Sequence, residues 1–305
     1  MATIGITGGT GFVGTALSQS LLQAGHNIII FTRKPGRGTD TRISQAHWDP
    51  SKGMIDPQAL ESLDACIHLA GAGVADKRWT ASRKKEILES RTVGTSFLVD
   101  ALRRSAPNCK ALVSASAIGY YGPDAPGKSP FTEQSGPGND FLADTCTKWE
   151  AAAAPAASFL RLSIIRIGIV LGRGGGALPE FQKSLPFRVK AILGSGKQMV
   201  SWIHLADLVG IITKAATDES WSGVYNAVGP APVSNRQLMD ALARARGGFY
   251  LPVSIPAPAL KLAFGEMSIE ILKSCTVRPD RSTTEGYTFQ YPTIDAAAGN
   301  LLGRP

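Results

Sequence analysis

Residues 3–14 read Thr-Ile-Gly-Ile-Thr-Gly-Gly-Thr-Gly-Phe-Val-Gly, an apolar run that enters a glycine-rich turn. A helical spacing of apolar residues follows, and Gly25 ends it. A strand, a glycine turn and a helix in this order are the setting of a dinucleotide-binding fingerprint, although such a turn can also occur without a ligand. Gly8 would make the tight turn, Gly11 would admit a pyrophosphate, and Gly14 would let the helix pack on the sheet. The free N–H groups at the helix start would bind the anion. We expect cofactor contacts from Gly8, Thr10, Gly11, Phe12 and Val13.

Strand and helix patterns alternate through the first half of the chain. Further apolar strands are predicted at residues 27–31, 66–70, 110–114 and 162–171, and a long helix at residues 82–104. Continuous apolar runs are typical of parallel strands that helices cover on both faces. The sequence therefore predicts an α/β fold with a Rossmann-type doubly wound parallel sheet. The pattern loosens after residue 165, and a mobile glycine-rich loop is expected at residues 172–176. We place a dinucleotide-binding domain at residues 1–165 and a smaller mixed α/β substrate region, interleaved with the sheet, at residues 166–305.

Composition limits the class of protein. The 305 residues are 44% hydrophobic, which excludes a disordered chain, and contain no apolar run long enough to cross a membrane. The start lacks a signal-peptide pattern, and the four cysteines are scattered without a C-x-x-C motif. We therefore expect a cytoplasmic protein without a disulfide framework or a metal site. The net charge is +8, but its basic residues are spread along the chain, so nucleic-acid binding is not expected.

The residues after the second strand indicate which nicotinamide cofactor would bind. An NAD-binding unit carries an acidic residue there that holds the ribose 2′-OH. Here Thr32, Arg33 and Lys34 follow the strand, and the next acidic residue is Asp40. Arg33 and Lys34 suit a 2′-phosphate, the first as a planar fork and the second as a point charge. The sequence therefore predicts NADP rather than NAD, and residues 1–165 as an NADP-binding domain; the alternative is a solvated basic turn.

Several motifs together resemble extended short-chain dehydrogenases/reductases. They are the glycine turn, Leu69-Ala70-Gly71 and the pair His204 and Asp207. Further segments resemble an atypical, NAD-dependent epimerase/dehydratase-like branch, often catalogued as nucleoside-diphosphate-sugar epimerases or as cell-division inhibitor homologues. These segments are residues 75–79, 90–91, 117–122, 148–150, 170–176, 194–196, 202–204 and 265–267. The resemblance covers nearly the whole chain. It implies the fold and the cofactor more than the reaction, because physiological substrates are not established for the group.

The resemblance also implies individual cofactor contacts. Thr32 and Arg33 would meet the adenosine phosphate. Leu69, Ala70 and Gly71 would pass under the ribose and pyrophosphate. The remaining contacts would come from Glu86 and Arg91 along the cofactor's edge and from Ile169 at the nicotinamide end. The alternatives are a solvated helix pair for Glu86 and Arg91, and plain core for Ile169. Extended relatives often dimerise through two helices that cover the sheet, so a homodimer is also an expectation.

This sequence lacks the catalytic tyrosine–lysine pair of the wider superfamily. The superfamily uses a tyrosine as acid/base, a lysine four residues later that lowers the tyrosine pKa, and a serine. No tyrosine in this sequence has a lysine four residues after it. If Glu150 is matched to the family's glutamate, Cys146 takes the place of the lysine and Leu142 that of the tyrosine. Whether the chain is a full enzyme is therefore open.

A serine and two tyrosines offer a partial replacement. Ser116 ends a predicted strand, Tyr120 and Tyr121 follow on the next loop, and Lys148 lies further along the chain. The hypothesis is that Ser116 and one tyrosine, first Tyr120, polarise a carbonyl with Lys148 as a nearby cation. The alternative is that these residues only line a pocket.

A second departure concerns the substrate. Enzymes of this type that act on nucleotide sugars commonly carry an arginine where this sequence has Val200, so a sugar-nucleotide substrate loses a main anchor. His204 and Asp207 are expected to tie a loop to a helix start. The sequence thus predicts an NADP(H)-dependent oxidoreductase or epimerase-like enzyme on an unidentified small substrate. The alternative is an NADP-binding sensor or interaction protein with little or no catalysis.

Overall fold

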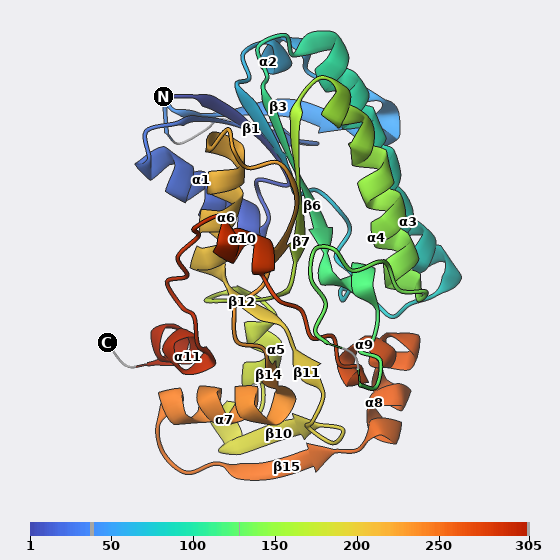
Figure 1. Ribbon diagram of the computed structural model, residues 1–305, viewed down its shortest axis with the longest axis vertical. Helices are drawn as coiled ribbons and strands as arrows, with labels where there is room; N and C mark the ends of the chain where they lie inside the picture. The colour runs from blue at the N-terminus through green and yellow to red at the C-terminus, as the bar shows by residue number, and fades with distance from the viewer. Residues whose placement is uncertain (37–39, 128, 304–305) are drawn as a thin grey trace.

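The computed structural model describes residues 1–36, 40–127 and 129–303. Its largest sheet has the strand order β13-β7-β6-β5-β1-β2-β3-β4, parallel except for the edge strand β4 (Figure 1). The order runs outward from β1 in both directions, which confirms the predicted doubly wound fold. Ligands of such sheets bind beyond the carboxyl ends of the strands at this switch. The strands are β1 (Thr3–Thr7), β2 (Asn27–Thr32), β3 (Ile43–Asp49), β4 (Met54–Ile55), β5 (Ala65–His68), β6 (Ala111–Ala117), β7 (Arg161–Ile167) and β13 (Gly223–Ala227).

Helices cover both faces of the large sheet (Figure 1). In β2, Ile28 and Ile30 pack in one core with the helices of one face, whereas Ile29 and Phe31 pack in a second core with those of the other face. Both faces of the strand are buried, which explains why the sequence reads as a continuous apolar run. One face carries α1 (Phe12–Gln23) and α6 (Leu205–Thr217), and the other carries α2 (Pro57–Glu61), α3 (Ala81–Ser105) and α4 (Phe141–Ala153).

The apolar run predicted as one strand at residues 162–171 is two strands. Gly168 separates β7 from β8 (Ile169–Gly172), which pairs with β12 (Trp202–His204) and β9 (Gly175–Gly176) in a separate sheet. A Cβ atom at Gly168 would lie 2.6 Å from the Ser201 carbonyl oxygen, so only glycine lets the chain leave the large sheet there. The expected boundary at residue 165 falls inside β7, and α6 and β13 bring later residues back to the large sheet.

The rest of the chain forms a smaller mixed region beyond the carboxyl ends of the large sheet (Figure 1). Its core contains Trp202, Ile192 of β10, Leu238 and Leu242 of α7, and Leu301 of α11. Two short sheets pair β10 (Val189–Leu193) with β15 (Leu251–Ile255) and β11 (Met199–Val200) with β14 (Val233–Ser234). Its helices are α5 (Leu178–Gln182), α7 (Asn235–Arg246), α8 (Ala257–Phe264), α9 (Ser268–Leu272) and α11 (Ile294–Leu302), whereas α10 (Asp280–Thr284) packs on β13 of the large sheet.

The glycine-rich stretch at residues 172–176 differs from the expected mobile loop. It forms the turn and second strand of the β8–β9 hairpin. The hairpin packs on Phe12, because a Cβ atom at Gly175 would lie 2.3 Å from Phe12 Cδ2. The Arg173 side chain donates a hydrogen bond to the Asn300 carbonyl oxygen of α11. The glycines therefore allow close packing onto the first turn of α1.

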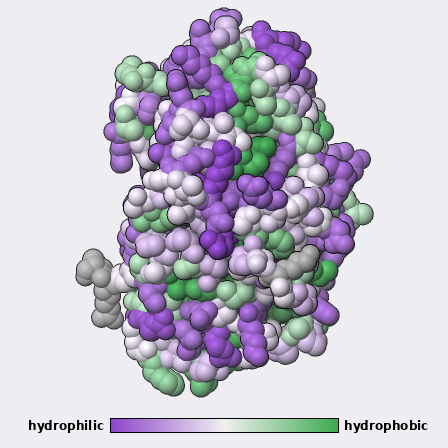
Figure 2. Space-filling model, viewed as in Figure 1, coloured by the Kyte–Doolittle hydropathy of each residue, from purple (hydrophilic) through white to green (hydrophobic). Residues whose placement is uncertain are grey.

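Within the described ranges, no helix has both the length and the apolar character needed to cross a bilayer. Hydrophilic and hydrophobic residues are interspersed over the face shown in Figure 2. All four cysteines are buried and unpaired, as expected from their scattered positions.

Candidate cofactor and active site

The glycine turn after β1 is closed on two sides by backbone. Gly8 has a φ of +72°, and a Cβ atom there would lie 2.9 Å from the Ala70 backbone nitrogen. A Cβ atom at Gly14 would lie 2.3 Å from the Gly8 carbonyl oxygen. The Gly11 N–H donates to that same oxygen at 3.0 Å. The turn is therefore compact and specific for glycine, as the fingerprint predicts.

The open side of the turn is the N-terminus of α1. Gly11 is the N-cap residue, and no side chain caps the helix. Thr10 and Gly11 are exposed, whereas the Phe12 side chain lies under the hairpin and Val13 packs against the core. Exposed N–H groups and the positive end of a helix dipole fit a pyrophosphate, so the structure has the cradle that a dinucleotide needs.

Two basic side chains follow β2 and face solvent. Arg33 and Lys34 are exposed, and neither forms an ion pair among the residues that the structure describes. The Thr32 hydroxyl accepts a hydrogen bond from the Lys34 N–H at 3.4 Å. A hydrogen bond from the Ser51 hydroxyl lowers the pKa of Asp49, and the charge of Arg33 contributes. The side chains of Arg33 and Lys34 are thus free to bind a phosphate at the end of β2.

Arg91 holds the segment that follows β5, and its expected cofactor contact stays a prediction. The Leu69 N–H donates to the Thr7 carbonyl oxygen at 3.1 Å, which places the segment beside the glycine turn. Arg91 Nη1 donates to the Ala72 carbonyl oxygen at 2.9 Å, and a Cβ atom at Gly71 would lie 3.4 Å from the Arg91 guanidinium. Burial lowers the pKa of Arg91.

Glu86 is placed differently from Arg91, although both lie on α3. Its carboxylate accepts a hydrogen bond from Arg83 Nη1 at 2.7 Å, and more than half of the Glu86 side chain is exposed. That hydrogen bond lowers the pKa of Glu86. Its expected cofactor contact therefore stays a prediction, and its observed partner is the buried Arg83 rather than Arg91.

A buried histidine fixes the strand ends beneath the glycine turn. His68 of β5 is fully buried, with Nδ1 2.6 Å from the Thr7 hydroxyl and Nε2 3.0 Å from the Thr95 hydroxyl. The Thr95 hydroxyl donates to the Arg91 carbonyl oxygen, so it must accept from Nε2–H, and Nδ1 must accept from Thr7. Burial lowers the pKa of His68 to about 4, which keeps the imidazole neutral.

This histidine predicts an acid-sensitive stability. Its pKa is about 4 in the folded protein and 6.5 in the unfolded chain, so between these pH values the unfolded state holds more protons. The free energy of unfolding should therefore rise between pH 4 and pH 6.5. The neutral His68 accounts for about 3 kcal/mol of this rise, and the full amount is reached above pH 6.5. Urea unfolding of the wild type and of His68→Asn across this range measures it. Identical pH slopes for the two proteins would contradict the prediction.

The candidate catalytic serine belongs to a buried ionic network. Ser116, at the carboxyl end of β6, donates its hydroxyl proton to Glu150 Oε1 at 2.7 Å. Arg166 of β7 binds both carboxylate oxygens of Glu150, at 2.8 and 2.7 Å. Burial alone would lower the pKa of Arg166, but hydrogen bonds and the charge of Glu150 raise it above its usual value. Ser116 is therefore an acceptor for any ligand unless its hydroxyl leaves Glu150.

Arg166 also organises the two tyrosines. Its Cζ atom lies 3.4 Å from the ring centre of Tyr120, and its Nη1 donates to the Tyr121 hydroxyl at 3.0 Å. The Tyr121 hydroxyl donates to Asn226 Oδ1 at 2.7 Å, and burial raises the pKa of Tyr121 to about 12. In contrast, Tyr120 is half-buried, and its hydroxyl has no hydrogen-bond partner among the described residues. Tyr120 is therefore the tyrosine with a phenol free to meet a ligand.

The structure does not bring Lys148 to this network. Lys148 lies on the exposed side of α4, where its Nζ atom is 2.7 Å from Asp144 Oδ2. The inward side of α4 presents Leu142 and Cys146 instead, since a Cβ atom at Gly119 would lie 3.1 Å from Leu142 Cβ and 3.8 Å from Cys146 Sγ. Burial raises the pKa of Cys146 to about 11, so the thiol is neutral. The cation beside Ser116 is Arg166 and not Lys148.

Sequence reasoning missed the roles of Arg166 and Glu150. The available signal was an arginine inside an apolar strand, Arg166, and an acidic residue that follows Trp149 on a helix, Glu150. A buried charge needs a partner of opposite sign, so the two could have been paired.

The remaining predicted residues have structural contacts. Ile169 begins β8 and is 37% exposed, so its contact with the nicotinamide end stays a prediction. His204 Nδ1 accepts from the Ala206 N–H at 3.1 Å and caps α6. Asp207 accepts from the backbone N–H groups of Gln290 and Tyr291, at 2.7 and 3.0 Å. His204 and Asp207 therefore tie the helix start to a later loop, as predicted.

The comparisons with known proteins agree with this geometry. The sequence profile of the NAD dependent epimerase/dehydratase family matches residues 4–227. The chain belongs to this family. In this epimerase-family protein, residues 255–301 also match a domain of unknown function.

The similarity to known relatives covers nearly the whole chain. The human epimerase family protein SDR39U1 is 36% identical over 304 residues, which cover 97% of this chain and 98% of that protein. Epimerase family protein Mb2239 of Mycobacterium bovis is 34% identical over 306 residues, which cover 100% and 99%. A crystal structure of human SDR39U1 (isoform 2) with NADPH has a TM-score of 0.85 and 33% identity, covering 98% of this chain and 99% of that one. These matches confirm that the chain resembles the atypical, epimerase/dehydratase-like branch.

Proposed function

We propose that this epimerase-family protein binds NADP(H) and acts with it as an oxidoreductase or epimerase-like enzyme on a small substrate. Three features support the cofactor: the glycine cradle, the uncapped start of α1, and the free basic pair Arg33 and Lys34. The human relative at TM-score 0.85 was crystallised with NADPH, which supports the same choice. When bound, NADP(H) supplies or accepts a hydride.

The free phenol of Tyr120 is the observation that carries the enzymatic proposal. Tyr120 lies directly over the Arg166 guanidinium, which Glu150 holds through two hydrogen bonds. The Arg166 guanidinium against the ring fixes the position of Tyr120, and its hydroxyl, unpaired among the described residues, can donate a proton to a substrate oxygen. Ser116, which donates to the same Glu150 carboxylate that holds Arg166, can orient the same oxygen once its hydroxyl turns from Glu150.

The residue at position 200 favours a small carbonyl compound or alcohol as the substrate. Val200, at the position of the arginine that grips a sugar nucleotide's diphosphate, is half-buried and paired with Val233. It offers no charge, so we propose a substrate without a diphosphate group.

A second candidate function is NADP binding without strong catalysis. It is favoured by one specific arrangement: the inward side of α4 presents Leu142 and a neutral Cys146, and the Ser116 proton is held by Glu150. In this reading the network is a structural support, and the protein responds to NADP(H) instead of turning over a substrate.

The cofactor proposal predicts a preference for NADPH that depends on Arg33 and Lys34. Titration followed by nicotinamide fluorescence should show tighter binding of NADPH than of NADH. Arg33→Ala and Lys34→Ala should each weaken NADPH binding by about tenfold or more, because each removes a charge-assisted contact, and should leave NADH binding nearly unchanged. Arg42→Ala is the control, because this exposed arginine pairs with Asp40. Equal affinities for the two cofactors would refute the phosphate role, and no binding of either would refute the cofactor itself.

The catalytic proposal predicts that Tyr120→Phe is selectively inactive. With NADPH and a panel of small carbonyl compounds, kcat/KM should fall by about 10²–10⁴, the usual contribution of a general acid. The NADPH dissociation constant should stay unchanged, because the phenol is not part of the cradle. Tyr291→Phe is the control, a tyrosine whose ring contacts His204 at a ring-centre distance of 3.9 Å, away from Tyr120. Unchanged turnover in Tyr120→Phe would remove Tyr120 from the mechanism, and NADPH binding without turnover by the wild type would favour the second function.

A further inference from the structure

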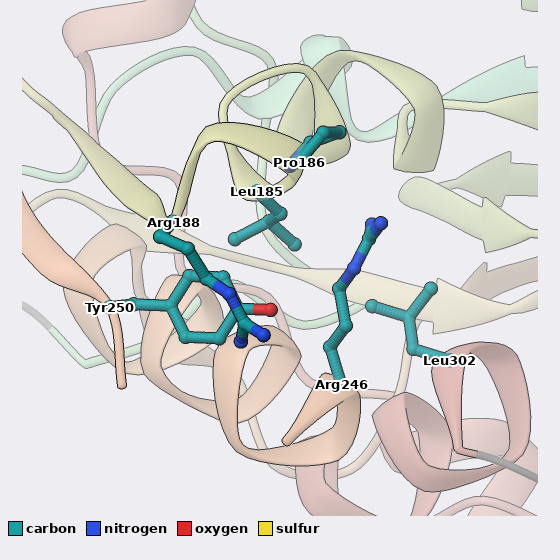
Figure 3. Close-up of a pocket in the computed structure, with 6 residues that line it drawn as sticks. All are labelled: Leu185, Pro186, Arg188, Arg246, Tyr250 and Leu302. Atoms are coloured by element: carbon teal, nitrogen blue, oxygen red, sulfur yellow. The ribbon is translucent and has the colours of Figure 1, made fainter. Parts of the chain in front are cut away.

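A pocket of about 320 Å³ opens in the C-terminal region, separate from the glycine turn (Figure 3). Its lining comes from the end of α7, from α11 and from the segments just before β10 and β15, and Figure 1 places α7, β10 and β15 at the end of the molecule away from the large sheet. The pocket is at the small end of the range for ligand sites, about 300–1,000 Å³. Its lining residues are Leu185, Pro186, Arg188, Arg246, Tyr250 and Leu302.

Arg188 is held in an uncommon conformation beside this pocket. Its φ is 59°, and it is the one non-glycine residue with a positive φ among those described. Such strain persists only where the surroundings enforce it, and it is frequent at ligand sites. The Leu251 N–H donates to the Arg188 carbonyl oxygen at 2.9 Å, and Arg188 Nη1 donates to the Gly247 carbonyl oxygen at 2.9 Å. Its Cζ atom lies 5.2 Å from the ring centre of Tyr250. The guanidinium is thus pre-positioned.

Arg246 reaches into the same space from the other side. It is the last residue of α7, and Figure 3 shows its side chain opposite Arg188, with Leu185 above the gap. Neither arginine has an acidic partner among the described residues, whereas Arg244, on the same helix turn, pairs with Asp295 at 2.6 Å. Both guanidinium groups thus line one pocket without a neutralising carboxylate among the described residues, and an anion bound there would be stabilised by both charges.

We propose that this pocket binds a small organic anion, with a phosphate or carboxylate group between Arg188 and Arg246. The apolar side chains of Pro186 and Leu302, beside the buried Leu185, would contact the body of the ligand. Guanidinium groups bind both kinds of anion through paired hydrogen bonds, so the site is defined by this shared chemistry. The proposal does not depend on the cofactor, because none of the lining residues belongs to the glycine turn or to the end of β2.

Calorimetric titration with phenyl phosphate and with benzoate tests the site and distinguishes the two anions. The experiment is done on the full chain with saturating NADPH, which occupies any phosphate site at the glycine turn. Saturable binding of at least one probe is expected, and the tighter probe identifies the anion. Arg246→Gln and Arg188→Gly should each weaken binding by about tenfold or more, since each removes a charge-assisted contact. Glycine suits the positive φ at position 188, so this variant is expected to fold.

Arg244→Gln is the matched control on the same helix and should change the affinity by less than about twofold, as expected for an exposed paired charge. The proposal is overturned if neither probe binds, or if Arg244→Gln weakens binding as much as Arg246→Gln does. It is also overturned if phenyl phosphate binds without NADPH but is displaced by it, because that ligand would then occupy the cofactor site. A protein that binds the probes but not NADPH would refute only the proposed cofactor.

Discussion

Replacement of Glu150 by alanine should lower the free energy of unfolding by about 3–5 kcal/mol. The variant leaves the Arg166 guanidinium buried without the carboxylate that accepts two of its hydrogen bonds, and Arg166 is only 3% exposed. A charge kept from water without a partner carries the full desolvation penalty. Urea unfolding at neutral pH measures the loss. The Ser116 hydroxyl also loses its acceptor, which adds to the effect.

A double variant separates this charge effect from a packing effect. Glu150→Leu combined with Arg166→Met removes both charges, and it should recover most of the stability that Glu150→Ala loses. Lys148→Ala on the same helix breaks an exposed ion pair and should cost about 1 kcal/mol or less. If Glu150→Ala lowers the free energy of unfolding by less than about 1 kcal/mol, water or another group must accept the hydrogen bonds of Arg166, and the prediction is wrong.

Substitution of Gly14 by alanine should cost about 3 kcal/mol or more, at the upper end for overpacked sites. The added Cβ atom would lie 2.3 Å from the Gly8 carbonyl oxygen and 2.6 Å from Gly9 Cα. Both contacts are backbone, so α1 must move away from the turn, and the anion cradle is lost with it. Thermal or urea unfolding measures the stability, and NADPH titration measures the second effect.

Gly299→Ala is the control for this substitution. Gly299 also lies inside a helix, α11, but a Cβ atom there meets nothing within 4 Å. Alanine forms helices better than glycine, so the control should be stabilised by up to about 1 kcal/mol. Equal effects of the two substitutions would contradict the argument that close packing selects glycine at position 14.

The first strand, the glycine turn and α1 could be predicted closely from sequence because their pattern is local. The apolar run that starts at Thr3 and enters the glycine turn is β1, Thr3–Thr7, and the helix predicted at residues 82–104 is α3, Ala81–Ser105. The break at Gly168 could not be predicted, because it depends on Ser201, which reaches it only in the folded chain. The same holds for the hairpin at residues 172–176, which is fixed by Phe12.

The candidate site could be predicted only in part, for a related reason. The sequence could place Ser116 and Tyr120 together because they are close along the chain. The cation was wrongly sought at Lys148, since residue type alone does not say which side of α4 faces the sheet. Arg166 and Glu150 meet through the pairing of β6 with β7 and the packing of α4, which are tertiary contacts.

The return of β13 to the large sheet also has a consequence for biosynthesis. β7 leaves the ribosome well before β13, which later covers its outer edge. Until then the β7 edge is bare, and Arg161 lacks the carbonyl oxygens of Ala215 and Ala216 to which it donates in the finished protein. An uncovered strand edge invites pairing with other chains. The nascent protein is therefore expected to need chaperone protection until residue 227 has emerged.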